Sequence, residues 1–534
     1  MAMDTDQLNT IFPVTFKIIG AQGVKQIFQG VPDQFDPLSV PDFLRGQTMF
    51  PDLPGYLYDL ASIEVHTYLA VQRQEQLATP PARLSINPTL AIVETAWQGL
   101  ADFFGPTLPP PNFAPEQGRQ YIVIFMHPLT RKLQVLSASS LDLLAVKIVV
   151  EDRSRQQIAQ SEQTTLRTLD HAVELAIVKG LLLKPLSAIS RNDDIFDPDQ
   201  TILPKFLAAE TFTLQWHITQ ACDLHCKHCY DRSQRRPVTR EEADCIMDQL
   251  YDFCHARNVH GQISFTGGNP LLHENFFELY QGAADRGFMT AILGNPTTPE
   301  ILSKIKMIQL PEFYQVSLEG LEQHNDYIRG QGHFSRVIQF LKELREAGIY
   351  SMVMLTLTRD NLNQVLPLAE FLRSQVDLFT FNRLSAVGEG AQLLTPTKEE
   401  YLTFLHEFSQ AQQGNPILAN KDNMINILRL QEDKPLFGGC AGFGCGAAFN
   451  FVSLLPDGEV QACRKFNSPI GNIHKQTLAA IYDSIEAASY RKGPKQCQGC
   501  VIRHVCGGCL AVIDSQGLDR TYDRDPCCFI EATA

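Results

Sequence analysis

The sequence predicts an α/β fold in which six strand-helix units form a partial barrel. Between residues 205 and 395, strand-like apolar runs alternate with amphipathic helical stretches, the pattern of parallel strands joined by crossover helices. The chain before this region reads as helices and a small winged helix, and the chain after it is rich in cysteine. We therefore expect a barrel flanked by two regions of different character.

The composition is that of a globular protein with several domains. The chain has 534 residues, of which 44% are hydrophobic and 19% are charged, and roughly three or four domains are expected at this length. The net charge of −14 disfavours nucleic acid and anionic membranes as partners. No secretory signal and no apolar run near the roughly 20 residues of a membrane span are visible, so we expect a cytoplasmic protein. There, the 14 cysteines are better explained as cluster or metal ligands than as disulfides.

The N-terminal residues 1–115 are expected to form a helical domain. In residues 54–72 the apolar side chains Leu57, Leu60, Val65 and Leu69 recur at helical spacing. The proline-rich residues 106–115 are predicted to be a linker.

Residues 116–200 are predicted to form a winged-helix domain. Two strand-like runs, residues 121–125 and 132–136, precede one helix that starts behind Ser139 and another that spans residues 165–179. The polar, proline-containing residues 193–204 then connect this domain to the barrel.

The predicted barrel over residues 205–395 is TIM-like and has six strands. They are expected at residues 214–218, 262–265, 289–293, 313–318, 350–356 and 378–381. Because α/β barrels place reactive groups on the loops after the strands, this rim is the predicted active face. Residues 396–435 are expected to be a helical connector and residues 436–534 a cysteine-rich domain.

Three cysteines directly follow the first predicted barrel strand. Cys222, Cys226 and Cys229 are spaced by three and then two residues. Three thiolates at this spacing can hold one iron-sulfur cluster and leave one iron without a protein ligand. An incompletely ligated iron can take part in chemistry, so the spacing favours an enzyme.

A second motif, GGNP at residues 267–270, ends the next predicted strand. Its two glycines allow a ligand to approach the backbone, and its proline fixes the exit of the loop. Together with the three cysteines, this motif resembles the radical S-adenosylmethionine (radical SAM) enzymes over about residues 210–395.

The resemblance implies that Cys222, Cys226 and Cys229 are catalytic and hold a 4Fe-4S cluster whose free iron binds S-adenosylmethionine. That family usually has glutamate where this chain has Asn269, so an amide carbonyl must replace a carboxylate as hydrogen-bond acceptor. The residues expected to bind the cofactor are Gly267, Gly268, Asn269, Pro270, Tyr230, Asn295, Ser317 and Glu319.

The C-terminal region carries a second group of cysteines. Two CxxC pairs are separated by only five residues, against roughly 15 to 20 in a zinc ribbon, which leaves zinc knuckles as the alternative. The group resembles the SPASM domain, which holds two auxiliary 4Fe-4S clusters. The implied ligands are Cys440, Cys445, Cys463 and Cys509 for the first cluster, and Cys497, Cys500, Cys506 and Cys527 for the second. The adjacent Cys528 leaves the choice of the last ligand open.

The winged-helix region resembles the precursor-peptide recognition element of peptide-modifying enzymes. In that module a leader peptide adds a strand to an exposed sheet edge. A purely structural role and DNA binding are the alternatives. Basic residues here are interspersed with acidic ones, which does not support DNA binding.

These features predict an enzyme that reductively cleaves S-adenosylmethionine to a 5′-deoxyadenosyl radical and modifies a ribosomally made precursor peptide, at or near cysteine residues. The sequence GGNPLLH with ILGNP most resembles the maturases of selenobiotic-type peptides. The expected cofactors are S-adenosylmethionine and three 4Fe-4S clusters, and the expected partners are the peptide and an electron donor such as flavodoxin or ferredoxin. Two alternatives stay open: a maturase of a protein substrate, as in sulfatase maturation, and a non-catalytic iron-sulfur redox regulator.

Overall fold

The computed structural model describes residues 5–27, 36–45, 53–105, 109, 113–191 and 202–530. By contacts between residues, the chain divides into two compact units, Met1–Leu186 and Ser187–Ala534. The predicted linker at residues 106–115 and connector at residues 193–204 lie largely outside the described residues. Within the described ranges, no helix is both long enough and apolar enough to cross a membrane.

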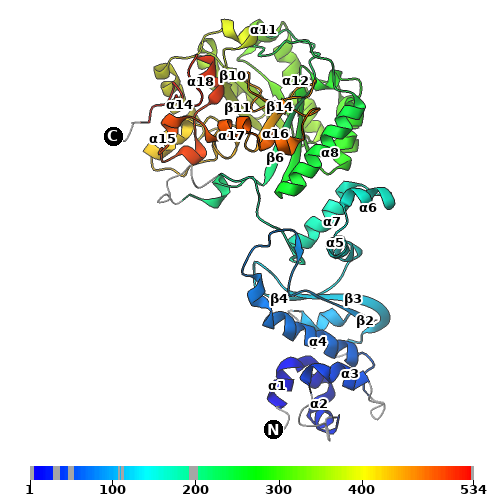
Figure 1. The fold of residues 1–534 in the computed structure, drawn as a ribbon. Coiled ribbons are helices and arrows are strands. Elements are labelled where there is room, and N and C mark those ends of the chain that lie inside the picture. Colours follow the sequence, from blue (N-terminus) through cyan, green and yellow to red (C-terminus); the bar gives the residue numbers. More distant parts are fainter. Residues whose placement is uncertain are drawn as a thin grey trace. The chain divides into compact units, whose positions relative to one another are not determined.

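The first unit begins with helices that share one apolar core (Figure 1). Ile11, Val40 and Val65 are buried there, each from a different helix. The predicted helix at residues 54–72 is confirmed as α4. The helices are α1 (Thr5–Ile11), α2 (Pro13–Ile27), α3 (Val40–Arg45) and α4 (Leu57–Gln72).

A three-stranded antiparallel sheet follows, in the order β2 (Ala91–Gln98), β3 (Glu116–Met126) and β4 (Leu133–Ser137). The prediction that residues 1–115 are helical is wrong at β2. That segment alternates, with Val93 and Thr95 buried and Glu94 exposed, and it pairs with β3. A two-residue strand β1 (Ser85–Ile86) pairs with β5 (Leu182–Leu183).

Three helices follow the sheet: α5 (Ser140–Val150), α6 (Arg155–Ser161) and α7 (Leu166–Lys179). Ser139 caps α5, because its side chain accepts from the backbone N–H of Asp142 while the Asp142 carboxylate accepts from that of Ser139. Gly180 ends α7 at φ 88°, a conformation that glycine adopts without strain. These boundaries confirm the predicted helix starts. The winged-helix domain over residues 116–200 stays a prediction, and its sheet shares β3 with β2, which lies before residue 116.

The second unit is built on a nine-stranded sheet in the order β11-β10-β9-β8-β7-β6-β12-β13-β14. Neighbouring strands from β6 to β11 are parallel, which confirms the six predicted barrel strands. β12 extends the sheet beyond β6, so the barrel stays partial. The barrel strands are β6 (Thr211–Thr219), β7 (His260–Gly267), β8 (Met289–Leu293), β9 (Phe313–Ser317), β10 (Ser351–Leu357) and β11 (Leu378–Arg383).

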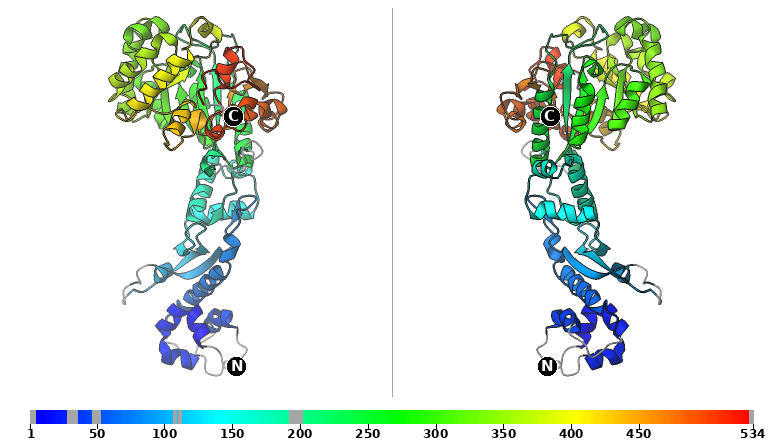
Figure 2. Two further views of the ribbon diagram at one scale, coloured as in Figure 1. Left: turned by 90° about the vertical axis from the view of Figure 1, so that its left-hand side faces the viewer. Right: turned by 90° about the vertical axis from the view of Figure 1, so that its right-hand side faces the viewer.

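Helices between these strands cover one face of the sheet (Figure 2). Thr239 and Glu242 form a capping box at the start of the first of them, and Asn258 ends it at φ 57°. Trp216 and Phe265 stack at the sheet surface beneath these helices. The helices are α8 (Arg240–Arg257), α9 (Phe276–Asp285), α10 (Pro299–Ile308), α11 (Glu322–Arg329), α12 (His333–Ala347) and α13 (Val365–Leu372).

The C-terminal part of this unit consists of short elements joined by cysteine-bearing loops. The predicted helical connector contains α14 (Lys398–Ala411) and α15 (Ile425–Gln431). The elements that follow are β12 (Phe451–Leu454), β13 (Glu459–Gln461), β14 (Pro469–Asn472), α16 (Leu478–Tyr482), α17 (Ile485–Lys492) and α18 (Leu510–Ser515).

Candidate active site

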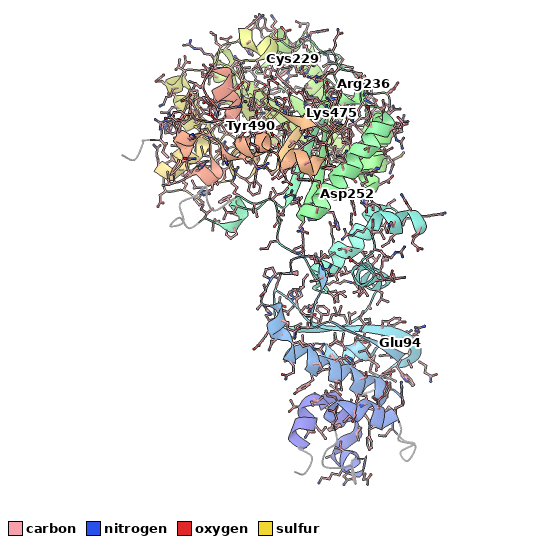
Figure 3. All side chains as sticks on the ribbon, viewed as in Figure 1. Glu94, Cys229, Arg236, Asp252, Lys475 and Tyr490 are labelled. Carbon is pink, nitrogen blue, oxygen red and sulfur yellow. The ribbon has the colours of Figure 1, made fainter. Side chains whose placement is uncertain are left out.

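The three predicted catalytic cysteines lie on the loop after β6. The backbone N–H of Cys229 donates to the carbonyl of Cys226 at 3.2 Å, and that of Lys227 donates to the carbonyl of Ile328 at 3.0 Å. The second bond ties the loop to α11, and Figure 3 labels Cys229 near the same end of the unit. The cysteines therefore lie at the carboxyl-terminal rim, as predicted.

These thiols fit an iron-sulfur cluster. All three are free of disulfides. Burial raises the pKa of Cys226, Arg329 opposes this shift, and Cys222 and Cys229 add to it, so the three sulfurs influence one another. Among the described residues, no three His, Cys, Asp or Glu side chains converge on a point that could hold a single metal ion.

The glycine loop after β7 packs directly against the cysteine loop. A Cβ at Gly267 would lie 2.0 Å from the carbonyl oxygen of Thr219, and one at Gly268 would lie 2.2 Å from that of Ala221. The backbone N–H of Gly268 donates to Thr219 at 3.0 Å. The absence of side chains at the two glycines thus allows the glycine loop to pack against the cysteine loop. This packing role adds to the ligand-binding role predicted from the sequence.

Two asparagines at the ends of neighbouring strands converge on the cysteine loop. Asn269 donates from Nδ2 to Oδ1 of Asp223 at 3.1 Å, and Asn295 donates to the same oxygen at 2.6 Å. Asn295 Nδ2 also lies 3.8 Å from the sulfur of Cys222. Both predicted cofactor residues therefore lie beside the first cysteine, and Asp223 is a contact that sequence reasoning missed.

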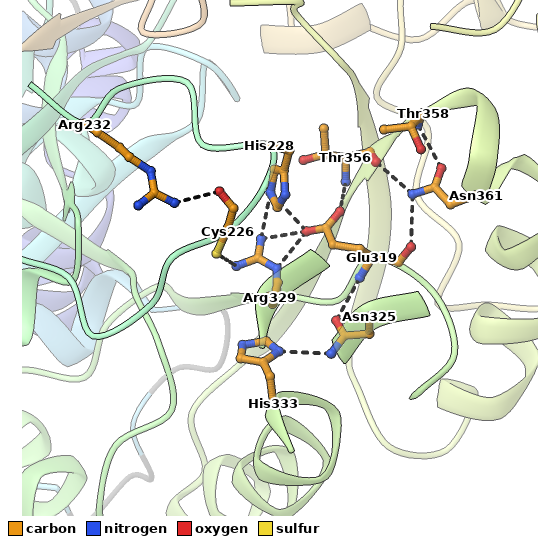
Figure 4. Close-up of polar contacts among 10 residues, drawn as sticks. All are labelled: Cys226, His228, Arg232, Glu319, Asn325, Arg329, His333, Thr356, Thr358 and Asn361. Atoms are coloured by element: carbon orange, nitrogen blue, oxygen red, sulfur yellow. Dashed lines mark hydrogen bonds and ion pairs between the residues drawn. The ribbon is translucent and has the colours of Figure 1, made fainter. Parts of the chain in front are cut away.

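A buried ion pair lies on the other side of the cysteine loop (Figure 4). Arg329 donates from Nε at 2.9 Å and from Nη2 at 2.6 Å to Oε1 of Glu319, and Nη1 lies 3.6 Å from the sulfur of Cys226. Burial opposes charge on Arg329, but Glu319 and Cys226 outweigh it and raise the pKa. His228, whose pKa burial lowers to about 4, lies 3.4 Å from the same carboxylate.

Glu319 is fully engaged in this network. Its Oε2 accepts from the backbone N–H of Thr356 at 2.8 Å, and its side chain is 2% exposed. Although burial opposes charge, His228 and Arg329 keep the pKa of Glu319 below its usual value. The predicted contact between Glu319 and the cofactor stays a prediction, and Arg329 is the group that Glu319 positions. Sequence reasoning missed Arg329, and its place in the stretch HNDYIRGQGHF was the only signal.

Two further predicted cofactor residues, Ser317 and Tyr230, lie on different sides of the rim. Ser317 is half-buried and ends β9. Tyr230 makes a 3.3 Å hydrogen bond to Nε2 of His217 on β6, and burial raises its pKa to about 12. The nearby thiols of Cys229 and Cys463 both raise the pKa of Tyr230. Tyr230 therefore lies between the first cysteine group and the C-terminal cysteines.

The structure brings together the four cysteines predicted for the first auxiliary cluster. Burial, together with Cys509 and Cys440, raises the pKa of Cys445 to about 12 and that of Cys463 to about 11. Lys421 lies beside Cys440 and lowers its pKa against the effect of burial. The four thiols influence one another electrostatically, and a cation lies beside one of them.

Asn423 joins the loops that carry the two auxiliary groups. Its Oδ1 accepts from the backbone N–H of Cys440 at 2.7 Å, and its Nδ2 donates to the carbonyls of Cys506 at 2.8 Å and Gly508 at 2.6 Å. Its side chain is buried. No sequence pattern had indicated this residue.

Cys528 lies beside the three other cysteines predicted for the second auxiliary cluster. One cavity is lined by Cys497, Cys500, Cys506 and Cys528. Burial, together with Cys500 and Cys528, raises the pKa of Cys497 to about 11. Cys528 acts on Cys506 in the same way.

Cys527, the predicted eighth ligand, does not line the cavity that contains Cys497, Cys500 and Cys506. It lines a separate cavity with Arg383 and Tyr401, and Arg383 is the neighbour that lowers its pKa against burial. A turn at Asp525 separates the adjacent cysteines, since Asp525 Oδ1 accepts from the N–H of Cys527 at 3.0 Å and its carbonyl accepts from that of Cys528 at 2.9 Å. The structure therefore does not bring Cys527 to the site predicted for it.

Comparison with known families gives two matches within the second unit. Residues 216–372 match the radical SAM superfamily, and residues 445–501 match the SPASM iron-sulfur cluster-binding domain. The first range contains the three cysteines after β6, and the second contains Cys445, Cys463, Cys497 and Cys500.

Individual relatives span more than one activity. The chain is 25% identical over 326 residues to an AdoMet-dependent heme synthase of Oleidesulfovibrio alaskensis (56% of this chain, 82% of the relative). It is 27% identical over 330 residues to the mycofactocin maturase MftC of Mycolicibacterium smegmatis (57% of this chain, 79% of the relative). Among solved structures, Streptococcus suis SuiB bound to the precursor peptide SuiA gives a TM-score of 0.50 at 15% identity, covering 77% of this chain and 96% of that one. This last likeness concerns the fold alone.

Proposed function

The chain is an enzyme with a radical SAM domain and a SPASM domain, and on this premise we propose that it modifies a ribosomally made precursor peptide, at or near cysteine residues. The observation that carries the proposal is the placement of three free thiols beside the glycine loop at the barrel rim. The proposed electron donor is a flavodoxin or a ferredoxin.

When bound, a 4Fe-4S cluster with S-adenosylmethionine supplies a 5′-deoxyadenosyl radical that abstracts a hydrogen atom from the substrate. In this chain Cys222, Cys226 and Cys229 would hold the cluster. The buried cation of Arg329 beside Cys226 offsets thiolate charge, and Glu319 fixes its orientation. Tyr230 and His217 close the side of the site toward the auxiliary cysteines.

Anaerobic reconstitution with iron, sulfide, S-adenosylmethionine and dithionite tests the chemistry. Cys226→Ala should abolish formation of 5′-deoxyadenosine and still leave the auxiliary iron in place. Cys245→Ala is the matched control, because Cys245 is exposed on α8 and lies outside both cysteine groups. Turnover by Cys226→Ala, or none by the unaltered chain, would contradict the proposal.

The peptide substrate is supported by the first unit. Among the described residues, β4 pairs only with β3, so one side of β4 has backbone groups free to pair with another strand. Leu133 and Leu136 on β4 are 37% and 40% exposed, which offers apolar contacts to a peptide. The alternative is a maturase of a protein substrate. It would leave the free edge of β4 without a role.

We further propose three clusters per chain, the second auxiliary one ligated by Cys528 in place of Cys527. The shared cavity of Cys497, Cys500, Cys506 and Cys528 supports this choice. Four thiolates at each auxiliary site would make both clusters electron carriers without an open iron.

A further inference from the structure

An arginine near the start of the second unit holds the loop that carries Cys445, one of the cysteines predicted for the first auxiliary cluster. Arg191 donates from Nη2 to the carbonyl of Phe443 at 2.6 Å and to that of Cys445 at 2.8 Å. Its Nη1 donates to the carbonyl of Arg491 on α17 at 3.3 Å. The guanidinium carbon lies 4.4 Å from the centre of the Phe449 ring. One side chain therefore joins the Cys445 loop to α17.

This cation has no carboxylate partner within the part of the chain that the structure describes. All three of its hydrogen bonds go to neutral carbonyls, and its Nε is buried without a hydrogen bond. Burial lowers the pKa of Arg191 to about 10, and Cys445 is the group that opposes this shift most. Arg191 therefore stays charged at neutral pH. A cation so placed is costly unless negative charge lies close to it.

We infer that Arg191 raises the reduction potential of the first auxiliary cluster by placing a fixed positive charge beside Cys445. The inference rests on the proposed function, in which Cys445 is one of the four ligands of that cluster. Reduction adds one negative charge to an iron-sulfur cluster, and a cation beside a ligand stabilises the reduced form more than the oxidised one. Because the proposed function makes this cluster an electron carrier, its potential decides how readily it accepts an electron.

The other explanation is that Arg191 only holds the loop in place. Two substitutions separate the two explanations. Arg191→Lys keeps the charge but loses the planar fork that reaches two carbonyls, whereas Arg191→Gln keeps a donor and loses the charge. If Arg191 only holds the loop, the potential should be the same in both variants. If the charge is what matters, the potential should fall mainly in Arg191→Gln.

Redox titration followed by electron paramagnetic resonance tests the inference on the anaerobically reconstituted full chain. Each variant is combined with Cys226→Ala, which removes the signal of the cluster at the barrel rim and leaves the two auxiliary signals. Arg191→Gln should lower one auxiliary midpoint potential by about 59 mV, a tenfold change in a one-electron equilibrium, and leave the other in place. Arg191→Lys should lower it by less than half as much. The signal that shifts should be the one that Cys463→Ala abolishes.

Arg491→Gln is the matched control for the loss of an arginine at this loop. Arg491 donates to the carbonyls of Ala448 at 3.0 Å and Tyr482 at 2.8 Å, and within the described residues its hydrogen bonds reach no cysteine. Its substitution also removes one charge and two hydrogen bonds, yet it should leave both auxiliary potentials nearly unchanged.

An unchanged potential in Arg191→Gln would overturn the inference. Equal shifts in Arg191→Gln and Arg191→Lys, or in Arg191→Gln and Arg491→Gln, would overturn it as well. Loss of auxiliary iron in Arg191→Gln would assign Arg191 to assembly of the site and would also overturn its role in the potential. If the unaltered chain gave no iron-sulfur signal, the proposed function itself would fail, which is distinct from a failure confined to Arg191.

Discussion

At the scale of single residues, two adjacent cysteines near the C-terminus face different surroundings. Cys528 shares a cavity with Cys497, Cys500 and Cys506, whereas Cys527 lies beside Arg383. Arg383 is itself held by Asp525, with Nη1 and Nη2 donating to the two carboxylate oxygens at 2.9 and 2.6 Å. Because this bidentate pair is buried, the turn that separates the cysteines is fixed.

We expect Cys528→Ala to lower the iron content of the reconstituted chain by about one third, the share of one 4Fe-4S cluster among three. Cys527→Ala should keep the full iron content. Iron and sulfide per chain, with electron paramagnetic resonance of the reduced protein, measure the difference, and each variant is the matched control of the other. Loss of iron in Cys527→Ala would contradict the assignment of Cys528.

Glu64 provides a pH-dependent contribution to the stability of the first unit. The residue is 1% exposed, and it accepts from the backbone N–H groups of Val14 at 2.6 Å and Thr15 at 3.1 Å, in the first turn of α2. Burial raises its pKa to about 7, and the hydrogen bonds from Thr15 and Val14 only partly counteract it. The folded state therefore holds this proton more tightly than the unfolded state, whose carboxyl has a pKa near 4.5.

The contribution of Glu64 is present in full below pH 4.5 and is lost as pH rises toward 7, because there the unfolded state binds fewer protons than the folded one. The free energy of unfolding should fall by about 3 kcal/mol over this range. Urea unfolding at pH 5 and pH 8 measures it, in a Trp216→Phe background so that the fluorescence comes from Trp97 of the first unit. Glu64→Gln cannot titrate and should lose most of the pH dependence. An identical pH dependence in both proteins would show that Glu64 is not its source.

Residues of this kind could not be predicted from the sequence. Arg329 contacts Cys226 across 103 positions, and Asn423 contacts Cys506 across 83. A buried polar side chain leaves no periodic pattern, because its position is set by partners from other elements. The cysteines and the glycine loop were predictable because their function fixes their spacing along the chain.

At the scale of elements, five segments meet around Arg329. The guanidinium on α11 contacts Glu319 after β9, Cys226 and His228 on the cysteine loop, and through Glu319 the N–H of Thr356 on β10. Asn361 in the loop after β10 donates to the carbonyl of Glu319 at 3.0 Å. The ion pair therefore couples the position of the cysteine loop to the neighbouring βα loops.

Removing the cation from this network should be costly. Arg329→Gln leaves Glu319 buried without its ion-pair partner, and we expect the second unit to lose about 3–5 kcal/mol of stability. Arg329→Lys keeps the charge but not the two-pronged contact, so it should lose less. Urea unfolding of the anaerobic protein measures both losses.

The double variant Glu319→Gln with Arg329→Gln is the control for this prediction. Because the two residues interact directly, its loss should be smaller than the sum of the single losses. Additive losses would show that the pair is not coupled, and an unaffected Arg329→Gln would show that the ion pair does not stabilise the rim.

Elements with a strong pattern were predicted, and those with a weak one were not. The six barrel strands are buried apolar runs, which the sequence displays plainly. β2 was missed, because AIVETAWQ is only half-buried and includes Glu94 and Gln98 on its exposed face. Its strand character comes from pairing with β3, a contact between distant parts of the chain.

At the scale of the whole molecule, the chain combines two compact units of different content, and the proposed function gives them different tasks. The second unit contains all 14 cysteines and both family matches. The relatives named above cover 56% and 57% of this chain, so a large part lies outside those matches. The first unit has its own apolar cores and an unpaired sheet edge among its described strands. In the proposed function, the first unit therefore contributes to binding of the precursor peptide and takes no part in the radical chemistry.

This division of tasks predicts separate effects on binding and chemistry. A chain that starts at residue 187 should form 5′-deoxyadenosine without peptide at an unchanged rate, because every cysteine and the whole rim are retained. The same chain should bind a labelled precursor peptide at least tenfold more weakly, because it lacks the edge of β4. Fluorescence anisotropy measures binding, and chromatography measures 5′-deoxyadenosine.

A point substitution tests the same prediction in the full chain. Leu136→Asp places a charge on the exposed face of β4 and should weaken peptide binding, because a charge in a strand-to-strand contact must be desolvated. Leu129→Asp is the matched control, since Leu129 is 88% exposed in the turn before β4 and lies outside the strand. Equal affinity in Leu136→Asp and Leu129→Asp, together with unchanged affinity in the shortened chain, would mean that the peptide is held by the second unit alone.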